Sequence, residues 1–192
     1  KRFNDFKYLG SYIRSTLHDT SVRKAQAMAA LHSMDTCWKS NLSRPTKIKL
    51  FRATVESVLL YGCETWTMTS ALNYVIDGFY TRLLRKVLRI SWRSHTTNKV
   101  LYGNLRKISN AIRERRLRFA GHIYRHDVQP VHQLLFWTPK HGKRSVGGPA
   151  LTYVDVLCKD TGRSVADLKN LMADRELWAE TVRTSSSKEE ML

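Results

Sequence analysis

The stretch that decides the fold lies over 70–93 and reads SALNYVIDGFYTRLLRKVLRISWR. Its apolar side chains recur every three or four residues, which is the period of an α-helix with one buried face. We therefore expect a helix from Ser70 to about Ile90. The inward face of this helix is predicted to consist of Leu72, Ile76, Phe79, Leu83, Val87 and Ile90.

Over 82–93 the opposite side of this helix is predicted to be basic, and no acidic residue interrupts that span. An ordinary solvated face mixes charges, because opposite charges four residues apart stabilise a helix and like charges do not. Arginine also binds phosphate through two parallel hydrogen bonds. We interpret the row as a phosphate-binding surface, with a merely solvated face as the alternative. Its members are Arg82, Arg85, Lys86, Arg89 and Arg93.

A second helix with the same division is expected from its cap at Ser109 to about Arg125. Ile112, Phe119, Ala120 and Ile123 are predicted to face inward. The opposite side is predicted to hold Arg115, Arg118, His122, Arg125 and His126. Two more arginines, Arg113 and Arg116, fall on or beside the apolar side. We expect them to extend toward solvent, to pair with an acid, or to mark a second contact surface.

The rest of the chain predicts further helices and one strand. Residues 6–13 (FKYLGSYI) favour a short strand. A helix is expected over about 20–40, capped at Asp19, Thr20 or Ser21, with an inner face of Ala25, Met28, Ala29, Leu31 and Cys37 or Trp38. Ser43 should cap the next helix, with Pro45 in its first turn, ending near Gly62. Shorter helices are expected over about 100–105, 131–137, 151–159, 165–173 and 174–183. The fold class is therefore mainly α, a helical bundle with a short N-terminal strand and a small helical C-terminal subdomain.

Five segments are expected along the chain. Residues 1–66 hold the strand and the first helices, and 67–137 form a basic helical segment. Residues 138–149 (TPKHGKRSVGGP) form a linker rich in glycine, proline and basic residues. The basic residues of this linker could bind a nucleic-acid backbone, or they could only make the linker soluble. They include Lys140, Lys143 and Arg144. Residues 150–185 form a small helical subdomain, and 186–192 are predicted to be a frayed tail.

Composition points to a polyanionic partner. The 192 residues carry a formal net charge of +17, and 42% of them are hydrophobic. So much like charge is tolerated mainly beside a polyanion, and nucleic acid is the leading candidate. Three scattered cysteines and the lack of a signal peptide or an apolar stretch of ~20 residues favour an intracellular protein, in the cytoplasm and nucleus, with no membrane partner. The start, without Met, suggests a piece of a longer chain.

No catalytic motif is recognisable. His122 and His126 have the spacing of two zinc ligands on one helix, but no compact set of further ligands is nearby in the sequence. Two polar histidines on an anion-binding face are the preferred interpretation. The dispersed C-terminal carboxylates are more typical of helix caps than of a magnesium site. We expect no independent enzyme and no cofactor.

Several stretches resemble the part of non-LTR retrotransposon reverse transcriptases (RTE-like and related LINE elements) that follows the polymerase palm. FKYLGSYI (6–13) resembles the exit from the palm, and the stretch over 41–66, ending in LLYGCETW, resembles the thumb. RLLRKVLRISW (82–92) with TTN (96–98), RRLRFAGHIYRHD (115–127), GGPALTYVDVL (147–157) and ADRELW (173–178) resemble the blocks that follow. The chain departs from the family pattern at Ala120, Gly148 and Tyr153, and it lacks the metal-binding box of the palm.

This resemblance implies a thumb-like bundle and C-terminal segment that hold template RNA and primer or target DNA during target-primed reverse transcription. Magnesium, catalysis and nicking would belong to the upstream polymerase and endonuclease regions of the same polyprotein. The thumb contacts to the backbone of the duplex would be Lys47, Lys49 and Arg52. This duplex could be an RNA–DNA hybrid.

Three other functions share these features. The first is a stand-alone nucleic-acid-binding protein derived from such an element. The second is a scaffold whose basic faces bind acidic proteins. The third is an enzyme with a zinc or magnesium site built from dispersed residues.

Overall fold

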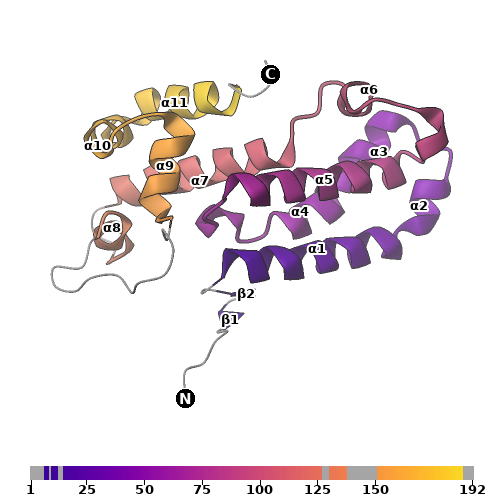
Figure 1. Ribbon diagram of the computed structural model, residues 1–192, viewed down its shortest axis with the longest axis horizontal. Helices are drawn as coiled ribbons and strands as arrows, with labels where there is room; N and C mark the ends of the chain where they lie inside the picture. The colour runs from indigo at the N-terminus through magenta and orange to yellow at the C-terminus, as the bar shows by residue number, and fades with distance from the viewer. Residues whose placement is uncertain (1–6, 9, 13–14, 127–129, 138–150, 188–192) are drawn as a thin grey trace. The chain divides into compact units, whose positions relative to one another are not determined.

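The computed structural model describes residues 7–8, 10–12, 15–126, 130–137 and 151–187, and within them the chain is mainly helical (Figure 1). Two compact units divide these residues differently from the predicted segments. Unit 1 contains residues 1–62 and 68–109, and unit 2 contains 63–67 and 110–192. The predicted linker over 138–149, with Lys140, Lys143 and Arg144, lies outside the described residues.

Unit 1 is built around three long helical segments. They are α1 (Thr16–Ser33), α5 (Ser70–Val87) and a continuous helix made of α3 (Arg44–Phe51), a π-helical turn (Arg52–Glu56) and α4 (Ser57–Leu59). α1 packs on α4 and on α5, and α3 packs on α5. Two short helices, α2 (Asp35–Lys39) and α6 (Asn98–Tyr102), and a single 3₁₀ turn (Trp92–Ser94) complete the helical part.

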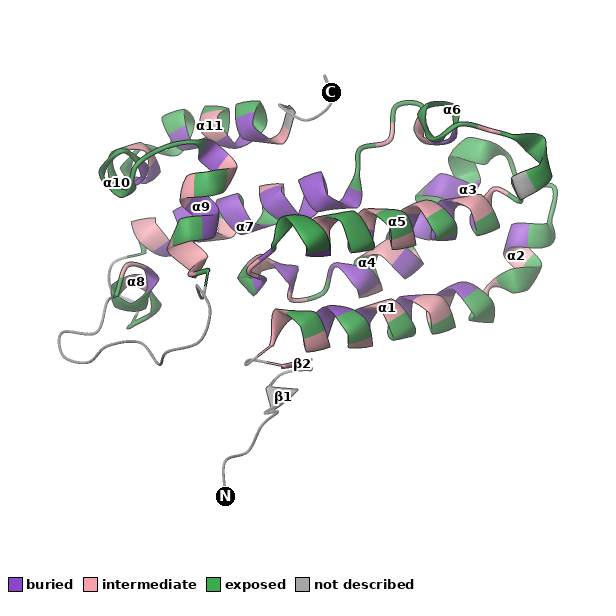
Figure 2. Ribbon diagram, in the orientation of Figure 1, coloured by how far each residue is buried: buried purple, intermediate pink, exposed green. Residues whose placement is uncertain are grey.

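Each long helix of unit 1 buries one face, as the alternating bands in Figure 2 show. Burying large apolar side chains contributes about 1.5–3 kcal/mol each, which makes this core the main source of stability. On α5 the buried face is close to the predicted one, but Tyr80 and Leu84 are buried while Phe79 and Ile90 are only partly covered. Other members of the core include Leu31, Trp38, Phe51, Val55, Leu59, Ile76, Leu83 and Val87.

The beginning of the chain differs from its prediction. The single strand expected over 6–13 is two short strands, β1 (Lys7–Tyr8) and β2 (Ser11–Tyr12), paired antiparallel. Gly10 permits the reversal, because its φ of +87° is a conformation that other residues rarely adopt. The Arg23 guanidinium of α1 donates to the Gly10 carbonyl at 2.6 Å and attaches the turn to the helix.

The helix expected over about 20–40 is also different. It starts at Thr16, where Ser15 accepts a hydrogen bond from His18 N–H, and it breaks at Met34 before α2 begins. Its inner face consists of Thr20, Arg23, Ala27 and Leu31, whereas Ala25 and Ala29 are exposed. The predicted register was wrong because three polar residues, Asp19, Thr20 and Arg23, are buried in the first part of the helix. One of them, Asp19, accepts a hydrogen bond from Tyr12 N–H.

Unit 2 consists of helices around the long helix α7 (Ile108–Arg125), which belongs to this unit from Asn110 onward. The others are α8 (Pro130–Leu135), α9 (Tyr153–Thr161), α10 (Val165–Ala173) and α11 (Arg175–Ser187). α11 continues through Ser187, so residues 186 and 187, which were predicted to belong to a frayed tail, are helical; the rest of that predicted tail lies outside the described residues. The core contains Leu117, Ala120, Leu135, Leu157, Leu168, Met172 and Trp178.

Gly121 lets α7 and α11 approach closely. A Cβ added at Gly121 would lie 2.2 Å from the indole nitrogen of Trp178, which real contacts do not allow. The indole N–H donates to the Leu117 carbonyl at 2.9 Å, so the buried Trp178 side chain is held directly over the glycine. This contact sets the spacing of the two helices.

Candidate nucleic-acid interface

The basic row predicted over 82–93 begins on the last two turns of α5. Arg82 and Lys86 are exposed there. Arg85 is half-buried, because its guanidinium donates to the Thr96 carbonyl at 2.7 Å and to the Asn98 side-chain oxygen at 3.0 Å. These bonds fix Arg85 against the loop that follows α5.

The prediction of one continuous helical stripe was wrong for its second half, because α5 ends at Val87. The Ile90 N–H donates to the Arg85 carbonyl at 2.9 Å and the Arg89 N–H to the Lys86 carbonyl at 3.1 Å. This is a Schellman ending, whose turning residue adopts a left-handed conformation and is usually glycine. Here that residue is Arg89, with φ of +53°. Arg93 follows in the 3₁₀ turn and is exposed.

We call Arg82, Arg85, Lys86 and Arg89 the α5 basic cluster. Within the described residues, no carboxylate forms an ion pair with any of the four. Their contacts are with neutral groups: Lys86 Nζ lies 3.4 Å from His32 Nε2, and an Arg89 guanidinium N–H donates to the Lys39 carbonyl at 3.3 Å. The cluster therefore keeps its positive charge.

The three predicted thumb contacts differ from one another. Lys47 is buried, and its ammonium donates to the Trp38 carbonyl at 2.7 Å, which assigns it a structural role. Lys49 is exposed on α3. Arg52 lies in the π-helical turn, 4.0 Å from the Glu56 carboxylate, with half of its side chain exposed. Only Lys49 and Arg52 therefore offer a cation to solvent.

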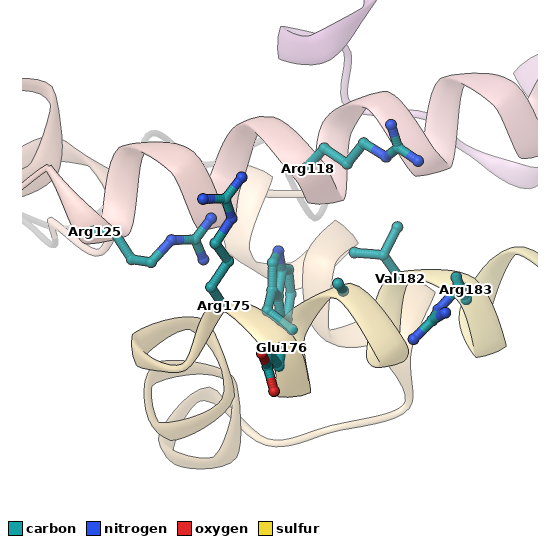
Figure 3. Close-up of a pocket in the computed structure, with 8 residues that line it drawn as sticks. Arg118, Arg125, Arg175, Glu176, Val182 and Arg183 are labelled. Carbon is teal, nitrogen blue, oxygen red and sulfur yellow. The ribbon is translucent and has the colours of Figure 1, made fainter.

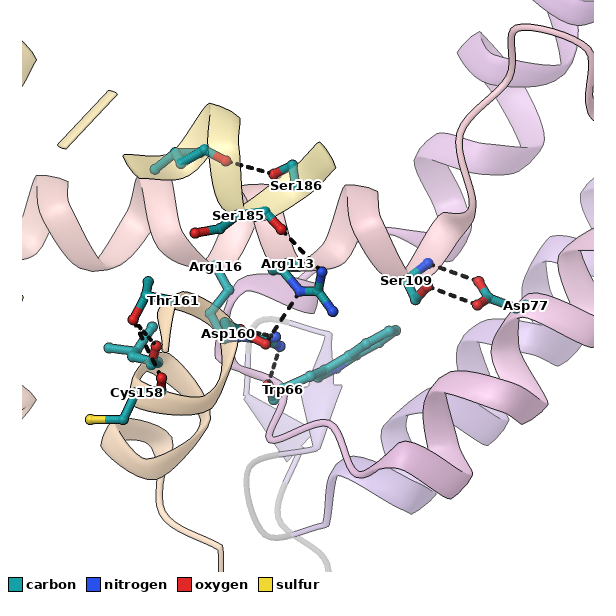
Figure 4. A network of polar contacts seen from close by, with 12 residues as sticks. Trp66, Asp77, Ser109, Arg113, Arg116, Cys158, Asp160, Thr161, Ser185 and Ser186 are labelled. Carbon is teal, nitrogen blue, oxygen red and sulfur yellow. Dashed lines mark hydrogen bonds and ion pairs between the residues drawn. The ribbon is translucent and has the colours of Figure 1, made fainter. Parts of the chain in front are cut away.

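Arg113 and Arg116 are buried in unit 2 and share one acid, Asp160 of α9 (Figure 4). Arg116 donates to Asp160 through Nε at 3.0 Å and through a second nitrogen at 2.5 Å. Arg113 Nε lies 3.4 Å from the other carboxylate oxygen, and its Nη1 donates to the Ser185 carbonyl at 3.2 Å. Of the three expected roles, pairing with an acid is the one observed. Neither guanidinium is exposed to a ligand.

The outer side of α7 is basic, as predicted, but part of its charge is neutralised. Arg115 lies 3.6 Å from Glu64, and Arg118 pairs at 2.5 Å with Glu114, four residues before it. Arg125 donates to the Met172 carbonyl at 3.0 Å. The prediction for this helix overlooked Glu114. These arginines consequently form a weaker like-charge row than the α5 basic cluster.

Sequence reasoning missed two arginines that join this side of α7. Arg175 and Arg183 of α11 line an open groove of about 550 Å³ together with Arg118 and Arg125 (Figure 3). The groove depends on the packing of α11 against α7, which spacing along the chain does not reveal. The ADRELW stretch that contains Arg175 was the only signal, and it was a resemblance rather than a physical pattern.

His122 and His126 are exposed, with ring centroids 4.3 Å apart. No group of three or more His, Cys, Asp or Glu side chains suited to a metal ion occurs among the described residues. The buried Cys63 thiol is a poor nucleophile as well, because burial and the nearby Glu64 charge raise its pKa from 9.0 to about 12.

The comparisons identify no relative. No family model, no curated protein and no solved structure matches this chain. Across the described part of the chain, no helix is long and apolar enough to cross a membrane.

Proposed function

We propose that this chain is a nucleic-acid-binding, thumb-like and C-terminal segment of a non-LTR retrotransposon reverse transcriptase. It holds template RNA and primer or target DNA, including an RNA–DNA hybrid, while the polymerase and endonuclease regions of the polyprotein supply the chemistry. In this proposal the chain itself is non-catalytic and works inside the cell, in the cytoplasm and nucleus.

One observation supports the proposal most strongly. Arg89 occupies a left-handed position that glycine would adopt at no cost, and it belongs to the α5 basic cluster, in which no member forms an ion pair with a carboxylate of the described residues. A non-glycine residue in this conformation costs about 1–2 kcal/mol. Among the described residues, its side chain donates one hydrogen bond, to the exposed carbonyl of Lys39 at 3.3 Å. A cation kept at such a position is explained if it binds an anion.

The way the family-like blocks assemble in unit 2 gives further support. The Tyr153 hydroxyl, from GGPALTYVDVL, donates to the carbonyl of Glu64 in LLYGCETW at 3.1 Å. Trp178 of ADRELW donates to the carbonyl of Leu117 in RRLRFAGHIYRHD. Blocks that resemble one family in sequence therefore also contact one another, as parts of one inherited fold would.

The test is the salt dependence of binding to a labelled RNA–DNA hybrid, measured by fluorescence anisotropy between about 50 and about 400 mM KCl. Each phosphate contact should contribute about 0.9 to the slope of log affinity against log salt. We expect Arg82→Gln/Lys86→Gln to lower the slope by nearly two and to weaken binding more than about tenfold at the lower salt concentration.

The control is Arg163→Gln/Lys169→Gln, which removes two exposed positive charges from unit 2 and should keep the slope. Equal losses in both variants would contradict the proposal, since they would reflect net charge alone. Binding that does not respond to salt would contradict it as well. Absence of hybrid binding together with tight binding to an acidic protein would favour the scaffold alternative.

A further inference from the structure

The groove between α7 and α11 has arginines on both of its walls (Figure 3). Arg118 and Arg125 project from α7, and Arg175 and Arg183 from α11. Its base is made of Trp178, Ala179 and Val182, and Trp178 is fixed by its bond to the Leu117 carbonyl. Arginines from two helices thus line one open space with a well-packed base, and in Figure 3 Arg175 points toward α7 whereas Arg183 points away from it.

The lining of this groove is strongly basic. Glu176 is the one carboxylate that lines it, and it points away from Arg175 in Figure 3. No described residue forms a hydrogen bond or ion pair with the Arg175 side chain. Arg118 pairs with Glu114, but its side chain is 69% exposed, and an exposed pair is easily replaced by a stronger anion. Figure 3 shows Arg175 and Arg125 directed toward the same space, which is unfavourable unless an anion lies there.

Arginine on two facing walls selects the chemistry of that anion. Guanidinium groups bind phosphate oxygens through paired hydrogen bonds, so phosphate is favoured over a single carboxylate. Arg118 and Arg125 are seven residues apart, which is roughly 10 Å along the helix axis. One phosphate does not extend over that distance, whereas a chain of phosphates does.

We propose that the α7–α11 groove is an anion site that binds consecutive phosphate groups, either of a nucleic-acid strand or of a polyphosphate. The site lies entirely within unit 2 and does not rest on the proposed role of the α5 basic cluster. Arg118 and Arg175 hold the anion from opposite walls. Arg125 and Arg183 add charge, and the bond from Arg125 to the Met172 carbonyl fixes its direction.

The test compares Arg118→Gln/Arg175→Gln with the charge-matched control Arg163→Gln/Lys169→Gln in the full chain. Calorimetric titration with inorganic tripolyphosphate should show affinity at least about tenfold lower in the groove variant, because two charge-assisted contacts are lost. The control should bind tripolyphosphate as the original chain does. Circular dichroism confirms that each variant is folded.

A labelled single-stranded oligonucleotide distinguishes the two sources of phosphate. A fall of about 1.4 in its salt slope in the groove variant, and none in the Arg163→Gln/Lys169→Gln control, assigns the site to a nucleic-acid strand. An unchanged slope beside weakened tripolyphosphate binding assigns it to a free polyphosphate or nucleotide. Equal tripolyphosphate affinity in the groove variant and the control would overturn the proposal. That result is independent of the hybrid-binding test of the α5 basic cluster.

Discussion

Asp160 shows how a single residue decides what its neighbours can do. Its carboxylate is the anion for two guanidiniums that are almost completely buried, and its own side chain is 9% exposed. Removing one partner of a buried ion pair leaves an uncompensated charge in a medium of low dielectric constant. Arg113 and Arg116 are therefore part of the interior of unit 2, although their sequence context suggested a binding surface.

We expect Asp160→Asn to destabilise the protein by about 3–5 kcal/mol, since two buried cations would lose the carboxylate that they share. The measurement is the free energy of unfolding from urea titration. Asp35→Asn serves as the control, because Asp35 forms an exposed pair with Lys39 on α2 and should change stability far less. Similar losses in the two variants would show that Asp160 is not a structural centre.

At the scale of the element, the end of α5 separates stability from binding. Arg89→Gly removes the strain of a left-handed backbone conformation and should raise the free energy of unfolding by up to about 1 kcal/mol. The gain is reduced by the loss of the exposed hydrogen bond from Arg89 to the Lys39 carbonyl. The same change removes a cation from the α5 basic cluster, so we expect hybrid affinity to fall several-fold. Urea titration measures the expected rise in the free energy of unfolding, and fluorescence anisotropy measures the expected fall in hybrid affinity. A loss of stability in Arg89→Gly would mean that the arginine serves the fold.

Local signals predicted the helix starts that depend on a neighbouring cap. Ser43 accepts a hydrogen bond from the Thr46 N–H, as predicted. The cap predicted at Ser109 was wrong, because α7 already begins at Ile108. The end of α5 carried no such signal, because an arginine occupies the place of the expected glycine. For the site, the exposed cations of α5 followed from periodicity. The groove and the Asp160 network join residues more than 40 positions apart, and no local pattern contains that information.

For the whole molecule, the net charge of +17 is divided between two uses. Some of the cations among the described residues are buried and donate hydrogen bonds to carbonyls, to side-chain oxygens or to Asp160. They are Arg23, Lys47, Arg113 and Arg116. Most other cations are on the surface, where their repulsion opposes folding at low ionic strength. A polyanion that binds the surface cations would relieve this repulsion, so binding and stability are linked through the same charges.

Alkaline pH tests the interior of the molecule independently of its surface. Burial, with smaller effects of neighbouring charges, raises the pKa of Cys63 from 9.0 to about 12 and raises the pKa of Tyr80 and Tyr153 above their usual 10.0. The folded state holds these protons more tightly than the unfolded chain does. Their contribution to stability is therefore complete below about pH 9, and it is lost as the pH rises through the ordinary values toward the raised ones.

We expect the free energy of unfolding to fall above about pH 9, by about 1.4 kcal/mol per pH unit for each group that titrates only in the unfolded chain. Cys63→Ala isolates one of these groups. At neutral pH this variant is less stable, because a buried side chain is truncated, but the difference from the original chain should shrink between about pH 9 and about pH 11. Urea titrations across this range measure it. A difference in the free energy of unfolding that stays constant with pH would show that the Cys63 thiol ionises as easily in the folded protein as in the unfolded chain. That result would conflict with the burial of Cys63.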